Sequence, residues 1–367
     1  MKTNAYAVIM AGGDGERFWP LSTPKRPKQF VDIFGGKPLI RHAFDRLRGL
    51  IPPERTLVVT AARLVPQTRR ALPEVPAANI VGEPCRRDTA AAVAVACGLV
   101  ARLGGPDAVG CILTADQLMT PEKAFRATLR DAIAAAAKFD AIVTMGIVPD
   151  RPATGYGYIE CGKPVDAGTK TAILAAKRFV EKPDEATARR YLKSGRFRWN
   201  AGMFVWRAGI MADAFAAAAP DFSPLIASVV SAKSVSALLS RAYPPLRAIS
   251  VDFAVMEKSK NILVAESQFK WDDVGSWQAL PNHFPADAEG NVCLGRTALL
   301  DAHDSIVVSS DDHVTAVVGL SGVVVVHTPF ATLVCPRSRA QDVKKLVRSH
   351  ADTCLDAAEA APAKPRR

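Results

Sequence analysis

The chain has 367 residues, of which 49% are hydrophobic and 23% are charged, as in soluble globular proteins. The net charge of +11 would suit a nucleic-acid partner, but the basic residues are spread along the chain without a basic helix or an aromatic stripe. We therefore expect no nucleic-acid partner, and a basic surface that meets a small anionic substrate.

The first half of the chain alternates apolar strands with helices. Strands are predicted at residues 6–10, 57–60, 79–81, 109–114 and 142–148, and helices at 38–50, 65–72, 89–103 and 121–139. This alternation predicts a parallel, doubly wound sheet, whose ligands lie beyond the carboxyl ends of the strands. The segment after residue 10, Glu83 and Asp116 all follow strand ends, so we expect them to converge.

The second half has two parts that differ in their predicted secondary structure. Strands are predicted at 156–161, 175–180 and 199–206, and helices at 184–194, 208–219 and 223–242. From about residue 291, short Val-, Ile- and Leu-rich runs at 305–308, 314–318, 322–326 and 331–334 predict a small all-β domain. A final helix at 341–350 precedes an Ala-, Pro- and Lys-rich tail. We therefore divide the chain into domains at 1–286 and 287–350 and a tail at 351–367 that is expected to be disordered.

The longest apolar stretch, residues 90–101, is too short to span a bilayer, and no secretory signal precedes the first strand. The seven cysteines are scattered without Cys-x-x-Cys spacing, which fits reduced thiols rather than a zinc site or a redox pair. The six histidines lack metal-ligand spacing, so we assign them no catalytic role. Together these features predict a cytoplasmic protein without a membrane partner.

The segment after the first strand combines glycines with cations. The loop residues are Ala11, Gly12, Gly13 and Gly15. Glycines let a backbone turn tightly and bring its N–H groups close to an anion. The cations that follow are Arg17, Lys25, Arg26 and Lys28. A strand, a glycine loop and nearby cations predict a polyphosphate site, with an ordinary turn as the alternative.

Spacing excludes two common phosphate loops. The Walker A pattern requires Gly-Lys-Ser/Thr after a gap of four residues, and nothing here fits it. The dinucleotide fingerprint requires a glycine where Phe18 stands, and the strand at 56–60 lacks the acid that holds a ribose hydroxyl.

The loop instead resembles the signature of sugar-1-phosphate nucleotidylyltransferases, and most of all that of mannose-1-phosphate guanylyltransferases. The matching residues are Gly12, Gly13, Gly15, Arg17, Phe18, Pro20, Leu21 and Ser22, followed by Pro27, Lys28, Gln29 and Phe30. The resemblance implies a Rossmann-like, doubly wound mixed sheet with a C-terminal domain like a left-handed β-helix. It also implies a nucleotide half up to about residue 150, a sugar-phosphate half at 151–286, and a homo-oligomer, a dimer, formed through the β domain.

Some relatives carry an isomerase domain after this point. The present sequence ends too early to hold one, so we expect no phosphomannose isomerase activity.

The resemblance implies that Asp116 and Asp273 bind a catalytic Mg²⁺. Magnesium prefers one or two carboxylates together with phosphate oxygens and water. A helix-capping role for Asp116 and a structural role for Asp273 are the alternatives. Thr114 and Gln117 stand where the family usually has Pro and His, which leaves the contacts beside Asp116 open.

The segments at 179–183 and 200–204 resemble the family's sugar-binding signatures. By this resemblance, Glu181 and Asn200 bind sugar hydroxyls, Lys182 holds the sugar phosphate, and the backbone near Gly157 touches the hexose. An ordinary surface pair is the alternative for Glu181 and Lys182.

Glu83, Asp88 and Thr89 lie in a segment that resembles the guanine-facing part of the family. Guanine presents N1–H and N2–H donors, so a carboxylate such as Glu83 is a suitable acceptor. Asp88 stands where the family more often has Asn, and the identity of the base therefore stays open.

The implied reaction transfers GMP from GTP to α-D-mannose 1-phosphate and yields GDP-mannose and pyrophosphate. The sugar phosphate is largely dianionic near neutrality and attacks the α-phosphorus in line, so no general base is required. Mg²⁺, Arg17, Lys28 and Lys182 would neutralise the charges that meet. Another sugar or base, or a regulatory subunit that binds a nucleotide sugar without turnover, are the alternatives.

Overall fold

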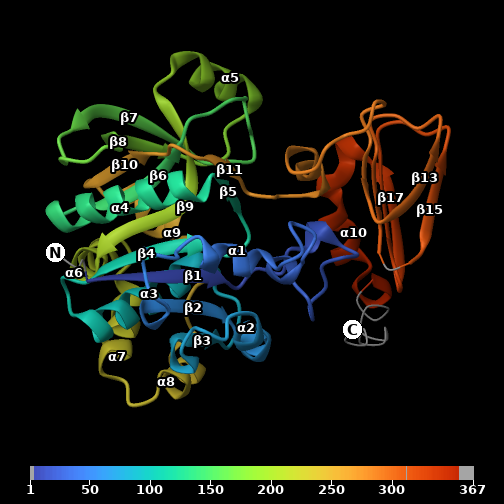
Figure 1. Ribbon diagram of the computed structural model, residues 1–367. Coiled ribbons are helices and arrows are strands. Elements are labelled where there is room, and N and C mark those ends of the chain that lie inside the picture. Colours follow the sequence, from blue (N-terminus) through green and yellow to red (C-terminus); the bar gives the residue numbers. More distant parts are fainter. Residues whose placement is uncertain (1–3, 311, 355–367) are drawn as a thin grey trace. The chain divides into compact units, whose positions relative to one another are not determined.

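The computed structural model describes residues 4–310 and 312–354 and divides the chain into two compact units made of interleaved stretches. Unit 1 comprises Met1–Gly12, Arg41–Ala115 and Met119–Trp271. Unit 2 comprises Gly13–Ile40, Asp116–Leu118 and Asp272–Arg367. Figure 1 labels the helices and strands of both units. Among the described residues, no helix combines the length and the apolar character needed to cross a membrane.

Unit 1 is built on a nine-stranded sheet with the order β3-β2-β1-β4-β9-β6-β10-β8-β7. The bounds of these strands are β1 Ala5–Ala11, β2 Thr56–Ala61, β3 Ile80–Glu83, β4 Val109–Thr114, β6 Ile142–Ile147, β7 Tyr158–Val165, β8 Ile173–Val180, β9 Phe197–Arg207 and β10 Ile262–Glu266. The doubly wound mixed sheet that we expected is confirmed. β10 is a strand that the sequence did not lead us to expect.

The first four strands of this sheet are parallel neighbours, as their alternation with helices predicted. Beyond them the sheet is mixed, because β9 lies antiparallel between β4 and β6. The β7 and β8 strands are also antiparallel to each other. A long, apolar β9 can pair on both edges, and only tertiary structure decides which strands it joins.

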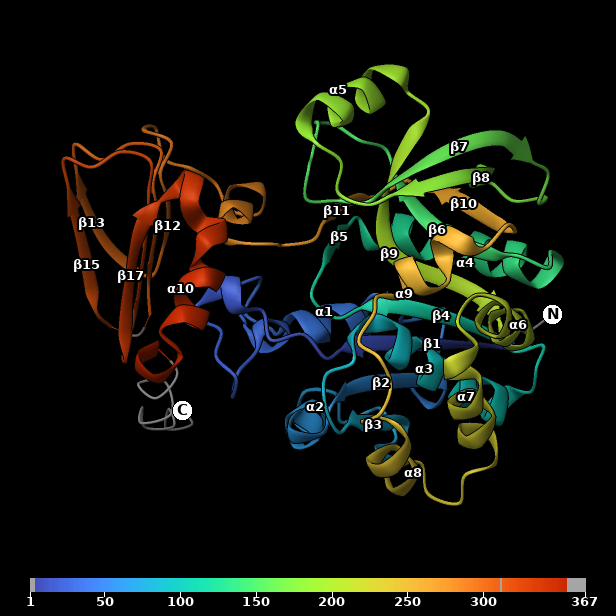
Figure 2. The same ribbon diagram turned by 180° about the vertical axis from the view of Figure 1, so that it is seen from behind.

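Helices cover both faces of this sheet. The alanine-rich helix α3 (Asp88–Gly104) lies on one face and α4 (Glu122–Lys138) on the other (Figures 1 and 2). At Gly98 a Cβ would lie 2.7 Å from Val229 Cβ, so the missing side chain lets α3 approach the helix α7 (Ser223–Ser231) closely. The other helices of unit 1 are α2 Val65–Ala71, α5 Glu185–Ser194, α6 Ala208–Ala218, α8 Val235–Ala242 and α9 Val251–Ala254, and α1 (Leu39–Asp45) begins in unit 2 and ends in unit 1.

Two helix predictions differ from the structure. The single helix expected over 223–242 is divided into α7 and α8, because Ser234 caps the second helix by accepting a hydrogen bond from the backbone N–H of Ala237. The helix expected over 38–50 ends at Asp45 and continues as turns, where Gly49 adopts a φ of 79°.

Unit 2 contains stacked short strands, as the sequence predicted. The parallel strands β12 (Val292–Leu294), β14 (Ile306–Ser309) and β16 (Val323–Thr328) place Val292, Ile306 and Val324 in one register. The strands β13 (Arg296–Leu300) and β15 (Val314–Val318) are also parallel to each other, and β17 (Ala331–Pro336) pairs antiparallel with β16. The prediction of a β-helix-like domain is confirmed.

The core of unit 2 joins this β domain to the chain that follows the glycine loop. Phe18 and Trp277 are buried, with ring centroids 5.0 Å apart, and they pack in one apolar cluster with Val292 and Val324. The helix α10 (Val343–Ser349) contributes Val343 to the same cluster. Residues 351–354 are helical, and the rest of the tail that we expected to be disordered, 355–367, lies outside the described residues.

Candidate active site

The glycine loop of unit 2 packs directly against Lys28. Gly15 adopts a φ of +63°, and a Cβ there would lie 2.1 Å from Lys28 Cβ. The hydroxyl of Ser22 donates a hydrogen bond of 2.7 Å to the carbonyl oxygen of Gly15 and closes the turn. Only glycine satisfies both requirements, a left-handed backbone and the absence of a side chain.

Lys28 connects the two aspartates that the sequence proposed as metal ligands. Its side chain is buried, and its ammonium donates to Asp116 Oδ2 at 3.0 Å and to the carbonyl oxygen of Asp273 at 2.7 Å. The same ammonium lies 5.9 Å from the centroid of the Phe18 ring. The sequence placed Lys28 among the cations that neutralise the substrates and did not predict this cluster, whose members are 88 and 245 positions from Lys28.

The neighbouring Asp272 has a different environment from Asp273. Its carboxylate accepts hydrogen bonds from the backbone N–H of Val274 at 2.7 Å and from Asn282 Nδ2 at 2.8 Å, and it contacts His283 Nε2 at 3.0 Å. Burial by itself raises the pKa of Asp272. The hydrogen bonds from His283 and Asn282 oppose this effect, and the resulting pKa lies below its ordinary value. Asp272 therefore holds the turn together.

Arg17 lies in the short 3-10 helix η1 (Glu16–Phe18) and is exposed. Within residues 4–310 and 312–354 it has no hydrogen-bond or ion-pair partner. Its neighbour Glu16 instead forms an ion pair with Arg348 of α10, with 3.0 Å between Arg348 Nε and Glu16 Oε2. Arg17 is thus a cation available to a ligand.

In unit 1 the carboxyl ends of the parallel strands place Glu83 beside the start of the glycine loop. Ala11 pairs with Thr60, and the next residue of β2 pairs with Glu83. Glu83 Oε1 accepts a hydrogen bond from the hydroxyl of Tyr243, and a Cβ at Gly12 would lie only 2.7 Å from Glu83 Oε2. The carboxylate therefore lies directly over Gly12, where the missing side chain makes room for it.

Burial raises the pKa of Glu83 to about 7, although the hydrogen bond from Tyr243 opposes this effect. Tyr243 is fully buried, and no local pattern in the sequence marked it as a functional residue. The guanidinium of Arg87 donates to the carbonyl oxygen of Pro244 at 2.9 Å and ties the two segments together.

Asp88 and Thr89 begin α3. Asp88 adopts a φ of 58°, and its Oδ1 accepts a hydrogen bond of 2.8 Å from the N–H of Thr89. The hydroxyl oxygen of Thr89 accepts from the N–H of Val251 at 2.9 Å, so this side chain links α3 to α9.

The predicted sugar-binding residues lie together in unit 1. Lys182 Nζ is 2.5 Å from Glu181 Oε1. A Cβ at Gly157 would lie 2.5 Å from Glu181 Oε2 and 3.5 Å from Asn200 Cβ, and the carbonyl oxygen of Gly157 accepts from the N–H of Asn200 at 2.8 Å. The absence of a side chain at Gly157 therefore lets these polar groups approach one another.

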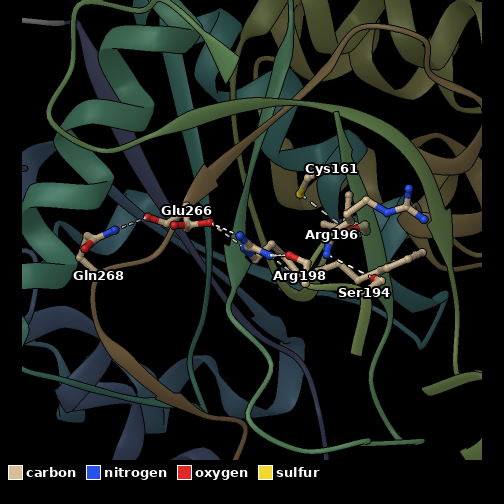
Figure 3. A network of polar contacts seen from close by, with 9 residues as sticks. Cys161, Ser194, Arg196, Arg198, Glu266 and Gln268 are labelled. Atoms are coloured by element: carbon tan, nitrogen blue, oxygen red, sulfur yellow. Dashed lines mark hydrogen bonds and ion pairs between the residues drawn. The ribbon is translucent and has the colours of Figure 1, made fainter. Parts of the chain in front are cut away.

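An ion pair supports the strand that carries Asn200. Arg198, two residues earlier on β9, donates from Nε to Glu266 Oε2 of β10 at 2.7 Å (Figure 3). Arg198 also packs over Gly146, the register partner of Asn200 on β6, where a Cβ would lie 2.9 Å from Arg198 Cβ. The pairing of β6 with β9 shifts between Thr144 and Gly146, an irregularity of the kind that redirects side chains next to functional sites.

Positive φ at non-glycine residues occurs at some of the candidate residues. Asp88, Lys182 and Val274 have φ of 58°, 45° and 47°, and Asp301 and Asp304 of the β domain, which are not candidate residues, have φ of 53° and 49°. Two of them are predicted site residues, and Val274 follows Asp273 directly. Such conformations cost about 1–3 kcal/mol each and are concentrated at functional sites.

Comparisons with known proteins identify the family of this chain. The family model described as nucleotidyl transferase matches residues 6–290, and the model described as MannoseP isomerase/GMP-like beta-helix domain matches residues 295–349. The chain is 38% identical over 349 residues to a mannose-1-phosphate guanylyltransferase of Escherichia coli, a match that covers 93% of this chain and 72% of the relative.

A mannose-1-phosphate guanylyltransferase of Sinorhizobium fredii is 36% identical, with 93% of this chain and 67% of the relative covered. Among solved structures, the protein described as mannose-1-phosphate geranyltransferase from Thermus thermophilus superposes with a TM-score of 0.85 and 34% identity, over 95% of this chain and 99% of that one.

Proposed function

This chain belongs to the nucleotidyl transferase family, and we propose that it transfers GMP from GTP to α-D-mannose 1-phosphate, with GDP-mannose and pyrophosphate as products. The observation that carries this proposal is the Lys28 cluster. Lys28 packs on the glycine loop and joins two aspartate residues, an arrangement suited to holding a polyphosphate and a divalent cation.

Asp116 and Asp273 fit a Mg²⁺ ion, because Mg²⁺ takes one or two protein carboxylates and completes its shell with phosphate oxygens and water. The described residues contain no group of three or more His, Cys, Asp or Glu side chains that would form an all-protein metal site. When bound, Mg²⁺ would supply positive charge to the phosphate oxygens. Lys28 already pairs with the Asp116 carboxylate in this cluster and bonds the backbone carbonyl oxygen of Asp273.

The protein's own cations would reduce the repulsion between the two anionic substrates, GTP and mannose 1-phosphate. Two unit charges 4 Å apart repel by about 1 kcal/mol in water and by several times more near a protein. Lys182 is exposed enough to leave Glu181 and hold the sugar phosphate, and Arg17 is available to the pyrophosphate. Glu181 and Asn200 would bind sugar hydroxyls. Catalysis therefore consists of positioning and charge stabilisation, without a general base.

Glu83 is the residue proposed to recognise the base. A carboxylate accepts from both the N1–H and the N2–H of guanine, whereas the exposed edge of adenine presents an acceptor at N1. The place of Glu83 over Gly12, the second residue of the glycine loop segment, supports this role.

A panel of four nucleoside triphosphates against several sugar 1-phosphates, read as pyrophosphate release, tests the proposal. GTP with mannose 1-phosphate is expected to give the highest kcat/KM. Binding of GDP-mannose without any turnover would favour a regulatory subunit, and a better pair would change the substrates but keep the reaction class.

We also propose a cytoplasmic homo-oligomer, a dimer, formed through unit 2. All seven cysteines are free thiols, as expected of a reducing compartment. Several large exposed apolar side chains lie in unit 2, namely Leu300, Val314, Val318, Leu320, Val334 and Leu346, and Leu300 and Val318 are register partners on neighbouring strands. Exposed apolar clusters mark interaction surfaces. Sedimentation of the wild-type protein and of a Leu300→Glu/Val318→Glu variant is expected to show a dimer and a monomer, respectively.

A further inference from the structure

A second acid lies beside the sugar-binding residues. Asp252, on α9, accepts a hydrogen bond of 2.8 Å at Oδ1 from Asn200 Nδ2. Its carboxylate is also close enough to Glu181 and Lys182 for both charges to act on its pKa. Asp252 is 52 positions from Asn200, and no family motif that we identified in the sequence includes it.

The amide of Asn200 is fixed in one orientation by three neighbours. Its Oδ1 accepts from the N–H of Gly202 at 3.1 Å and from the hydroxyl of Thr144 at 3.4 Å, and its Nδ2 donates to Asp252. A carboxamide has one oxygen and two N–H donors. Within the described chain no acceptor is bonded to the second N–H, which is therefore available to a ligand.

The helix that carries Asp252 is held firmly. The N–H of Val251 donates to the hydroxyl oxygen of Thr89 at 2.9 Å, and the carbonyl oxygen of Ile249 accepts from the N–H of Ala90 at 3.1 Å. Val251 and Ala254 are buried. The carboxylate of Asp252 is thus placed by two connections to α3, as the preorganisation of a binding site requires.

A purely structural role explains Asp252 poorly. Burial raises its pKa to about 6, and the charge of Glu181 raises it as well, while Asn200 and Lys182 oppose the increase. In the part of the chain that the structure describes, Asn200 is the only side chain that donates to it. The carboxylate also accepts from its own backbone N–H, but it has no other side-chain donor there and a like charge nearby. Such an arrangement costs folding free energy, and such groups cluster at functional sites.

We propose that Asp252 is a sugar-binding residue, which fixes the Asn200 amide with one carboxylate oxygen and accepts a hydrogen bond from a hexose hydroxyl with the other. The inference rests on the proposed function. Sugar hydroxyls are donors, and they can bond the carboxylate, to which no side chain other than Asn200 donates within the described residues. Glu181 and Asp252 then form a pair of carboxylates that selects a hexose over a sugarless phosphate.

The test measures KM for mannose 1-phosphate and for GTP separately, on the full-length protein, with Asp252→Ala and Asp252→Asn. A hydrogen bond to a charged group contributes about 1.5–3 kcal/mol, so Asp252→Ala is expected to raise KM for the sugar phosphate roughly 10- to 100-fold. The KM for GTP should stay within about twofold. Asp252→Asn should lie between, because it keeps an acceptor for Asn200 but loses the charge. Glu257→Gln is the matched control: this exposed acid also acts on Glu181 but does not bond Asn200.

A panel of mannose 1-phosphates, each lacking one hydroxyl, separates a direct contact from a structural effect. Wild-type protein should lose affinity for the analogue that lacks the bound hydroxyl, and Asp252→Ala should not discriminate against that analogue. Equal losses for both substrates, or an unchanged KM for the sugar phosphate in both variants, would overturn the inference. Should Asp252→Ala fail to fold, Asp252→Asn and the panel decide alone. Absence of turnover in the wild-type protein would instead remove the proposed function.

Discussion

Replacing Glu83 by glutamine is expected to make the protein more stable at pH 8 and to leave its stability unchanged at pH 4.5. Glutamine has nearly the same shape and keeps an oxygen that accepts from Tyr243. It carries no charge, whereas Glu83 must ionise in a buried place. The perturbation therefore isolates the cost of that ionisation.

The size of the effect follows from the pKa of Glu83, which is raised from its ordinary value of 4.5 to about 7. Below pH 4.5 the group is protonated in both the folded and the unfolded chain, so it costs nothing. Between pH 4.5 and 7 the folded protein keeps a proton that the unfolded chain has lost, so stability falls as the pH rises through this window and levels off above pH 7. At about 1.4 kcal/mol for each tenfold change in ionisation, the full cost above pH 7 is roughly 3 kcal/mol.

Urea denaturation at pH 4.5, 6 and 8 measures this difference, with Glu54→Gln, at an exposed position, as the control. Binding gives a second readout. The carboxylate fraction falls about tenfold from pH 8 to pH 6, so the apparent Kd for GTP should rise about tenfold in the wild-type protein beyond any change in Glu83→Gln. Protonation of GTP itself affects both proteins and cancels in the ratio. Equal stability of wild type and Glu83→Gln at pH 8 would refute the reasoning.

Three further predictions concern the loop, the metal and the sugar phosphate. Lys182→Ala should lower kcat/KM for mannose 1-phosphate about 100-fold, since a fixed cation is lost; near-normal kinetics would contradict its role. Gly15→Ala, with a φ of +63° and a Cβ contact of 2.1 Å, should destabilise by about 1–3 kcal/mol, whereas Gly13→Ala, with nothing within 4 Å, should melt as the wild type does. Asp116→Asn should raise the Mg²⁺ concentration for half-maximal turnover about tenfold, while Asp272→Asn should lower the melting temperature without that change; the reverse pattern would exchange their roles.

Local sequence was sufficient for most elements of the fold. The strands of the first half and the helix α5 lie within a few residues of their predicted bounds, because apolar period and capping residues act over a few positions. Asp184, for example, caps α5 as predicted and accepts from the N–H of Thr187. Ser234 is a local signal for the separation of α7 from α8, but the sequence was interpreted as one long helix over 223–242.

Motif spacing was sufficient to name the family, because a glycine loop that binds phosphate needs fixed intervals between glycine and cation. The same short-range motifs located Glu83, Glu181, Asn200 and the two metal-binding candidates as single residues.

Only the tertiary structure decided how those residues are grouped. Tyr243 lies 160 positions from Glu83, Asp252 lies 52 from Asn200, and Lys28 reaches a carbonyl oxygen 245 positions away. Strand β9 likewise enters the sheet antiparallel between β4 and β6. Periodicity and motifs describe which side chains a segment offers, but the pairing of strands, the burial that raises a pKa and the choice of hydrogen-bond partner depend on chain segments that meet only when the whole sheet has formed.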